Sequence, residues 1–303
     1  MSQSLLVRNG SGFKRPSGAI RFGPPVPPAI VTDWAWFEEF LAQRGELGQK
    51  QYKDWERRRG KIANWPEIMA GFKALEHRVL YTLQNSDVRT AIERTTHALG
   101  NIDKSAAKFD DIHNYSPPVP LIYIFHSILE KMGSVPIWND IQRYLFGDFR
   151  SLCWEPFCAS RSLDASKPVK LHDQRILDAF QWRMGNAYYS WLREVELLTY
   201  LRRTHRFDLK YHFLVDAEWR ADFIGGSILL ELYVKNREFK DDDSGRKLTC
   251  LSMNAGFTVV DIKMDIKEVN SGLKFGKPWM VSATSKDQIV RELRLKGCPV
   301  ISA

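Results

Sequence analysis

Apolar residues recur every three or four positions along most of the N-terminal half of the chain, which is the spacing of amphipathic helices. This pattern predicts three helices, over residues 33–60, 66–84 and 86–99. Asp33 is a suitable N-cap for the first helix. Residues 1–30 are instead rich in Gly and Pro, which is typical of an extended arm. We therefore predict an arm followed by a helical domain over residues 31–150.

Two helical patterns within residues 118–147 are separated by the turn-forming segment MGSVP. This order has the outline of a helix-turn-helix, which would place its second helix against DNA. An αα-hairpin that buries its apolar faces in a core fits the same pattern. Residues 151–178 show no regular period and contain Pro156 and Pro168, so we place a connector and a domain boundary there.

The pattern changes again after residue 179. Helical spacing in FQWRMGNAYYSWLREVELLTYLRR predicts one long helix with Glu194 near its middle. Apolar and polar residues then alternate over residues 213–223, which predicts a strand. Gly225 and Gly226 indicate a hairpin turn, and a second strand is expected over residues 228–235. A helical tail over residues 271–303, with a capping box at Ser285 and Gln288, is assigned to packing.

Two carboxylates stand in the predicted hairpin, Asp222 before the turn and Glu231 after it. Antiparallel pairing brings them opposite or diagonal to each other, at a spacing of roughly 5–8 Å. Carboxylates that close repel each other unless a cation lies between them, and Mg²⁺ prefers oxygen ligands of this kind. The alternative is a solvated hairpin face on which Arg220 and Lys235 form ion pairs with the two carboxylates.

The order of these features resembles the PD-(D/E)xK superfamily of nucleases, and within it the branch of very-short-patch-repair endonucleases. The matching segments are EVELLTYLR with Glu194, ADF with Asp222 and LLELY with Glu231, within residues 185–265. The resemblance implies a restriction-endonuclease-like domain of class α+β or α/β over residues 179–270, in which helices flank a mixed sheet. It also implies that Asp222 and Glu231 bind Mg²⁺ or Mn²⁺, and that Glu194 completes the metal shell or orients a water. A charge on a helix surface is the alternative for Glu194.

Downstream, DSGRKLTCLSMNAGFTVVDI resembles that branch's D-x-x-R helix, with Asp243 and Arg246 in the named positions. The family's catalytic lysine would stand two residues after Glu231, where this chain has Tyr233. Lys235 lies two residues further on, about 13 Å along a strand from Glu231. Residues that could take the missing role are Lys240, Lys247, Lys263 and, as a base, His212. A hydrogen-bonded strand histidine is the alternative for His212.

Basic residues after the long helix, Arg202, Arg203 and Arg206, suit phosphate contacts together with Arg246, although a solvated helix end explains the first three equally well. The net charge of +8, from 44 basic and 36 acidic residues, favours an anionic partner. Four cysteines form no CxxC pair, and no apolar run is long enough for a membrane span or a signal peptide. A cytoplasmic protein without membrane contact is therefore expected.

These observations converge on a metal-dependent DNA endonuclease. By analogy with nucleases that carry added helical domains, its setting would be phage defence or a mobile element. Two other functions fit the sequence: a nuclease fold that has lost cleavage and only binds DNA, and an assembly subunit of a transposition or defence complex. A protein partner and a homodimer are compatible with each of these.

Overall fold

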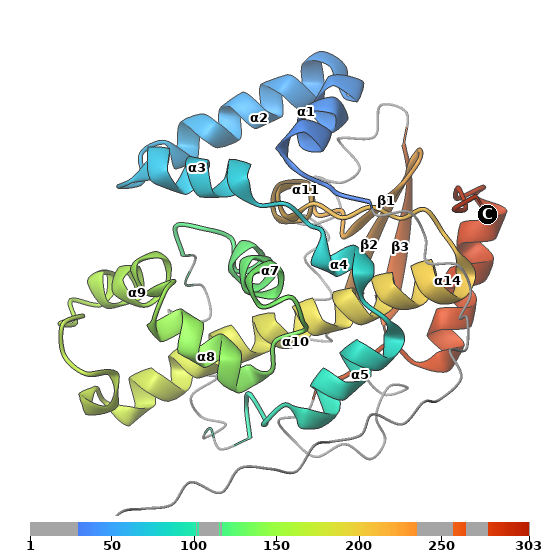
Figure 1. The fold of residues 1–303 in the computed structure, drawn as a ribbon. Coiled ribbons are helices and arrows are strands. Elements are labelled where there is room, and N and C mark those ends of the chain that lie inside the picture. Colours follow the sequence, from blue (N-terminus) through green and yellow to red (C-terminus); the bar gives the residue numbers. More distant parts are fainter. Residues whose placement is uncertain are drawn as a thin grey trace, which may run out of the picture.

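The computed structural model describes residues 30–100, 102, 115, 117–234, 257–264 and 278–302. These residues form a mixed α/β structure in which helices predominate and a three-stranded sheet lies to one side (Figure 1). The mixed class agrees with the sequence-based expectation. The division into separate domains and the nuclease-type fold remain predictions.

Short helices build the N-terminal part of the molecule. They are α1 (Trp34–Gln43), α2 (Gly45–Arg59), α3 (Trp65–Ala74), α4 (Val79–Thr82), α5 (Asn85–Arg94), α7 (Leu121–Met132) and α8 (Trp138–Phe146). Asp33 caps α1 as predicted, because its side chain accepts a hydrogen bond from the Trp36 amide at 2.9 Å. The single helix predicted over residues 33–60 was wrong. It is divided where Gly45 adopts a left-handed conformation (φ 60°).

The pair α7 and α8 confirms the predicted helix, turn and helix within residues 118–147, with the left-handed Gly133 (φ 68°) ending α7. Most of α7 is buried, including His126 and Phe125. Whether α8 reads DNA stays a prediction. The connector over residues 151–178 is less irregular than predicted. A 3₁₀ turn (Arg150–Leu152) leads into it, and it contains helix α9 (Trp154–Ser160) and a second 3₁₀ turn (Val169–Leu171).

The long helix α10 (Gln174–His205) runs the length of the molecule and packs against α5, α7 and α14 (Figure 1). It has 32 residues and begins six residues before the segment in which it was predicted. Its buried residues join the N-terminal helices to the C-terminal elements, so one continuous apolar cluster extends from Phe37 to Cys298. A side chain in the middle of α10, such as Glu194, is therefore held close to the centre of the fold.

The sheet contains β1 (Phe223–Gly225), β2 (Ile228–Val234) and β3 (Thr258–Met264), in that order. The first two strands form the predicted hairpin, in which Phe223 pairs with Leu230 and Gly226 takes the left-handed turn position (φ 58°). Strands β2 and β3 are parallel, and Glu231 pairs with Asp261. Helix α14 (Ala283–Leu295) packs against β3 and α10.

The strand predicted over residues 213–223 is wrong for most of its length, because residues Phe213–Trp219 form helix α11. The apolar and polar residues of this segment alternate as in a strand with one buried face. In the structure, however, Leu214 and its neighbours on both sides are all buried, because the segment is a short helix packed against α7. His212 caps this helix through its Nδ1 atom, which accepts the Leu214 amide hydrogen bond at 3.2 Å. Arg220 then ends the helix in a left-handed conformation (φ 55°).

The tail shows one further correction. The N-cap of α14 is Ser282, whose hydroxyl accepts from the Ser285 amide at 3.1 Å, so the predicted capping box lies three residues too late. Within the described ranges, the cysteines Cys153, Cys158 and Cys298 are free and buried. The same ranges contain no helix of the length and apolar character needed to cross a membrane.

Candidate metal centre

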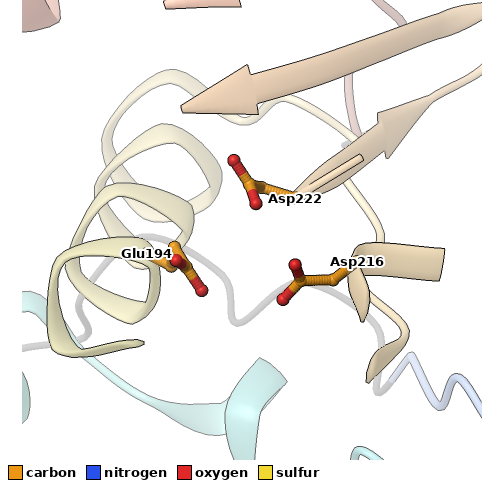
Figure 2. A group of neighbouring side chains, drawn as sticks. All are labelled: Glu194, Asp216 and Asp222. Atoms are coloured by element: carbon orange, nitrogen blue, oxygen red, sulfur yellow. The ribbon is translucent and has the colours of Figure 1, made fainter. Parts of the chain in front are cut away.

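Three carboxylates from separate elements meet at the junction of the helices and the hairpin. Glu194 comes from the middle of α10, Asp216 from α11, and Asp222 from the residue just before β1 (Figure 2). Their side chains point toward one another, and one oxygen of each lies within 4.8 Å of the others. Such a group of oxygen atoms can surround one hard divalent cation.

Hydrogen bonds fix these carboxylates. Ser190, one turn earlier on α10, donates to Glu194 Oε1 at 3.3 Å. Tyr211 donates its hydroxyl to Asp216 Oδ2 at 3.1 Å. Asp222 is tied to the hairpin twice: its amide donates to the Leu230 carbonyl at 2.8 Å, and its Oδ2 accepts from the Leu232 amide. The carboxylates are therefore preorganised by the fold.

The electrostatic environment of Asp222 is unfavourable without a cation. Burial raises the pKa of Asp222 well above its usual value, and the charges of Glu194 and Asp216 raise it further, against the opposing Leu232 amide. The nearby guanidinium of Arg193 is buried and donates to the Trp279 carbonyl at 2.8 Å. Burial lowers the pKa of Arg193, while the charges of Glu194 and Asp222 raise it. The described residues thus bring together more negative than positive charge at this point, which a divalent cation would balance.

The carboxylates open into a pocket of about 360 Å³. Its charged lining comprises Glu194, Asp216, Glu218, Asp222, Glu231, Arg59, Arg183 and Arg220. The rest of the lining is mainly apolar and comes from Pro117, Val119, Pro120, Leu121, Ile122, Ala187, Ala217 and Leu232, together with Ser190. The donor set is all oxygen, which suits a hard divalent cation better than metals that prefer sulfur or nitrogen ligands.

The structure brings the predicted pair Asp222 and Glu231 together. Continuing the register of Phe223 with Leu230 places them opposite each other across the hairpin. Both are buried, at 7% and 6% exposure, which contradicts the alternative of a solvated hairpin face. Glu231 lines the same pocket and adds to the rise in the pKa of Asp222, but it is not one of the three carboxylates in close contact. The closest group is instead completed by Asp216.

The alternatives for Glu194 and His212 are resolved by burial. Glu194 is 8% exposed and faces the pocket, so it is not a surface helix charge. His212 is 1% exposed, caps α11 and stacks on Phe37 with ring centroids 4.8 Å apart. Burial lowers its pKa well below the usual value, and it does not line the pocket. This placement supports a structural histidine in a helix cap and not a base.

Most of the residues suggested in place of the family's lysine fall outside the part of the chain that the structure describes. Lys235, Lys240, Lys247 and Arg246 lie outside the described residues. The backbone of Tyr233 pairs with that of Lys263 between the parallel strands β2 and β3, so Lys263 lies on β3, beside the strand that carries Glu231.

Three arginines predicted to contact phosphate are used inside the protein. Arg202 is 4% exposed, and its Nη1 donates to the Leu209 carbonyl at 2.6 Å. Arg203 donates to the carbonyls of Leu83 and Tyr81, at 2.8 and 2.7 Å. Arg206 ends α10 and donates to carbonyls of the C-terminal segment, including that of Ser302 at 3.0 Å. These placements give the three a structural role and do not support the predicted phosphate contacts.

Sequence reasoning missed Asp216. A straight strand would place Asp216 about 20 Å from Asp222, whereas α11 and the left-handed Arg220 fold the chain back. The signal available in the sequence was His212 just before the segment, a residue able to act as an N-cap. Arg59 belongs to the basic run of residues 55–61 at the end of α2, for which the sequence leaves both phosphate contact and a solvated helix end open, and the structure shows that Arg59 lines the pocket.

Comparisons of the chain with protein-family models, with curated proteins and with solved structures found no match.

Proposed function

We propose that the chain is a metal-dependent nuclease that hydrolyses phosphodiester bonds of DNA. The observation that carries the proposal is the convergence of three buried or partly buried carboxylates, from α10, α11 and the residue before β1, on one pocket that arginines also line. Two of these carboxylates, Glu194 and Asp222, also belong to the series that resembles PD-(D/E)xK nucleases, in which Glu194 lies on a helix, Asp222 before the hairpin turn and Glu231 after it.

In this proposal Glu194, Asp216 and Asp222 hold a Mg²⁺ or Mn²⁺ ion. When bound, such an ion neutralises the carboxylates, acidifies a water and polarises a phosphoryl oxygen. Ser190 and Tyr211 keep two of the carboxylates oriented through the hydrogen bonds at 3.3 and 3.1 Å. Glu231 would take the proton of the water as its oxygen bonds to phosphorus, and Arg59 and Arg220 would meet the phosphate's negative charge. The P–O bond to the sugar oxygen would break in the same displacement, and that oxygen would leave with a proton from solvent.

A cleavage assay tests this function. Supercoiled plasmid and labelled oligonucleotides are incubated with the protein in Mg²⁺, in Mn²⁺ or in chelator, and with the variants Glu194→Gln, Asp216→Asn and Asp222→Asn. Cleavage that needs the metal and falls at least about 100-fold in each variant supports the proposal. The control is Asp261→Asn, which removes an exposed carboxylate on β3 outside the pocket. Wild-type protein that cleaves no DNA in either metal, or variants that cleave normally, would reject it.

A DNA-binding module without cleavage is the second candidate, because Tyr233 stands where the family's lysine is expected. Binding that weakens steeply with salt, in a protein that cuts nothing, would favour this candidate. An assembly role in a defence or transposition complex, a cytoplasmic location, a protein partner and a homodimer remain expectations of the sequence.

A further inference from the structure

The pocket has a second wall that metal binding does not require. Pro117 and residues 119–122, before and at the start of α7, line the pocket together with Ala187 of α10, and Pro120 and Ile122 are the partly exposed members of this segment. Arg59, Arg183 and Arg220 line the pocket as well. A site that bound only a divalent ion would need oxygen ligands and water, and neither an apolar wall nor arginines.

One class of ligand has groups that suit the carboxylates, the arginines and the apolar residues of the pocket. The phosphate of a nucleotide forms charge-assisted hydrogen bonds with guanidinium groups and provides oxygen ligands to a divalent ion. Its base is flat and has apolar faces, so it packs against aliphatic and proline side chains while excluding water. A nucleotide combines these groups in one ligand.

The size and depth of the pocket restrict how the nucleotide arrives. A volume of about 360 Å³ holds a ligand of roughly one nucleotide and lies at the lower end of small-molecule pockets. The carboxylates Glu194, Asp222 and Glu231 are only 6–8% exposed, so a phosphate reaches them inside the pocket and not at a flat surface. A base-paired nucleotide would first have to be unpaired and unstacked, at a cost of a few kcal/mol.

We propose that the chain binds single-stranded nucleic acid or an unpaired strand end, one nucleotide of which enters the pocket with its base against residues 117–122 and its phosphate toward Arg59 and the carboxylates. The identification of this nucleotide as a substrate rests on the proposed function. Its recognition does not, because binding requires no bond to break.

Fluorescence anisotropy tests the recognition. A labelled 20-nucleotide strand is titrated as single-stranded DNA, as blunt duplex, as a duplex with an unpaired end, and as single-stranded RNA, in Ca²⁺ to suppress cleavage. Single strands and unpaired ends should bind at least 10-fold more tightly than the blunt duplex. The DNA and RNA arms show which sugar the pocket accepts, and tight binding of either supports the proposal. A blunt duplex that binds as tightly as the single strands, or the absence of binding to all four, overturns it.

Two variants locate the binding in the pocket. Ala187→Trp fills the pocket from α10 without removing a charge and should weaken single-strand binding at least 10-fold, whereas Asn186→Trp, on an exposed neighbouring position, should not. Arg59→Gln should also weaken it and lower the salt slope by about one, whereas Arg57→Gln, whose side chain is 77% exposed, should not. Circular dichroism and melting confirm that each variant is folded. Folded Ala187→Trp and Arg59→Gln that bind like wild type overturn the proposal.

The two proposals fail in different ways. Pocket-dependent binding of single strands by a protein that never cleaves would reject the nuclease and leave the recognition intact. Cleavage of blunt duplex as fast as of single strands, unaffected by Ala187→Trp, would leave the nuclease intact and reject the recognition.

Discussion

Replacing Asp222 by Asn should stabilise the metal-free protein and abolish its response to metal. The three oxygens lie within 4.8 Å of one another. At that separation two unit charges repel by about 3.5 kcal/mol at an effective dielectric constant of about 20. Asp222 has two such neighbours, so the repulsion on an ionised Asp222 would be about 7 kcal/mol. The protein can avoid this repulsion by keeping Asp222 protonated, which costs about 5.6 kcal/mol at about pH 8 for a carboxyl with an ordinary pKa of about 3.9. The Leu232 amide and solvent offset part of this, and we expect a gain of about 2–4 kcal/mol from Asp222→Asn.

The stability difference between Asp222→Asn and wild type depends on pH. Because the folded pKa of Asp222 is raised, the wild type loses stability as pH rises above the unfolded value of about 3.9 and continues to lose it up to the folded pKa. The variant has no such loss. Its advantage should therefore be small at about pH 5 and larger at about pH 8.

Thermal melts in chelator and in Mg²⁺ measure both effects. In chelator at about pH 8 the variant should melt about 4–8 °C higher than wild type. Mg²⁺ at about 100 times its dissociation constant should stabilise the wild type by about 2.7 kcal/mol and leave the variant unchanged. Asp261→Asn, the same substitution at an exposed position, should behave as wild type in both conditions. A variant that is less stable than wild type in chelator, or that still gains stability from Mg²⁺, would refute the electrostatic reasoning.

Three further predictions concern groups around the centre. Tyr211→Phe removes the hydroxyl that donates to Asp216 Oδ2 and should lower the affinity for Mg²⁺, measured by calorimetry, about 10- to 100-fold. An unchanged affinity would show that Tyr211 does not position Asp216. Arg202→Met removes the buried hydrogen bond to the Leu209 carbonyl and the ion pair with Asp208, 3.5 Å away, and should lower the free energy of unfolding in urea by about 3 kcal/mol. The salt dependence of DNA binding should not change, and a smaller slope would instead indicate that Arg202 contacts a phosphate. His77 is fully buried, which lowers its pKa to about 3, so protonation of the unfolded state below about pH 6.5 should cost the wild type about 2 kcal/mol between about pH 7 and pH 5, measured relative to a His77→Phe variant. The comparison with the variant cancels the opposite contribution of Asp222, and a difference between the two proteins that does not change with pH would contradict the burial of His77 as a neutral ring.

Several elements follow from local sequence alone. The helical period defines α7, α8 and α10, and Asp33 marks the start of α1. Two glycines between apolar runs specify the β1–β2 hairpin, and strand parity then places Asp222 opposite Glu231. These features depend on interactions between residues close in the chain, which sequence spacing reports directly.

Other features were decided by contacts between distant segments. Residues 213–219 alternate like a strand, but packing against α7 and the His212 cap make them a helix, and only that helix brings Asp216 to the other two carboxylates. Arg202 follows a helix as a surface arginine would, yet the tertiary fold buries it. The sequence by itself therefore determined the hairpin and singled out three of the pocket's carboxylates, Glu194, Asp222 and Glu231. The position of Asp216 and the apolar part of the pocket lining depended on the tertiary structure, because burial against remote segments outweighs the small free-energy differences between local conformations.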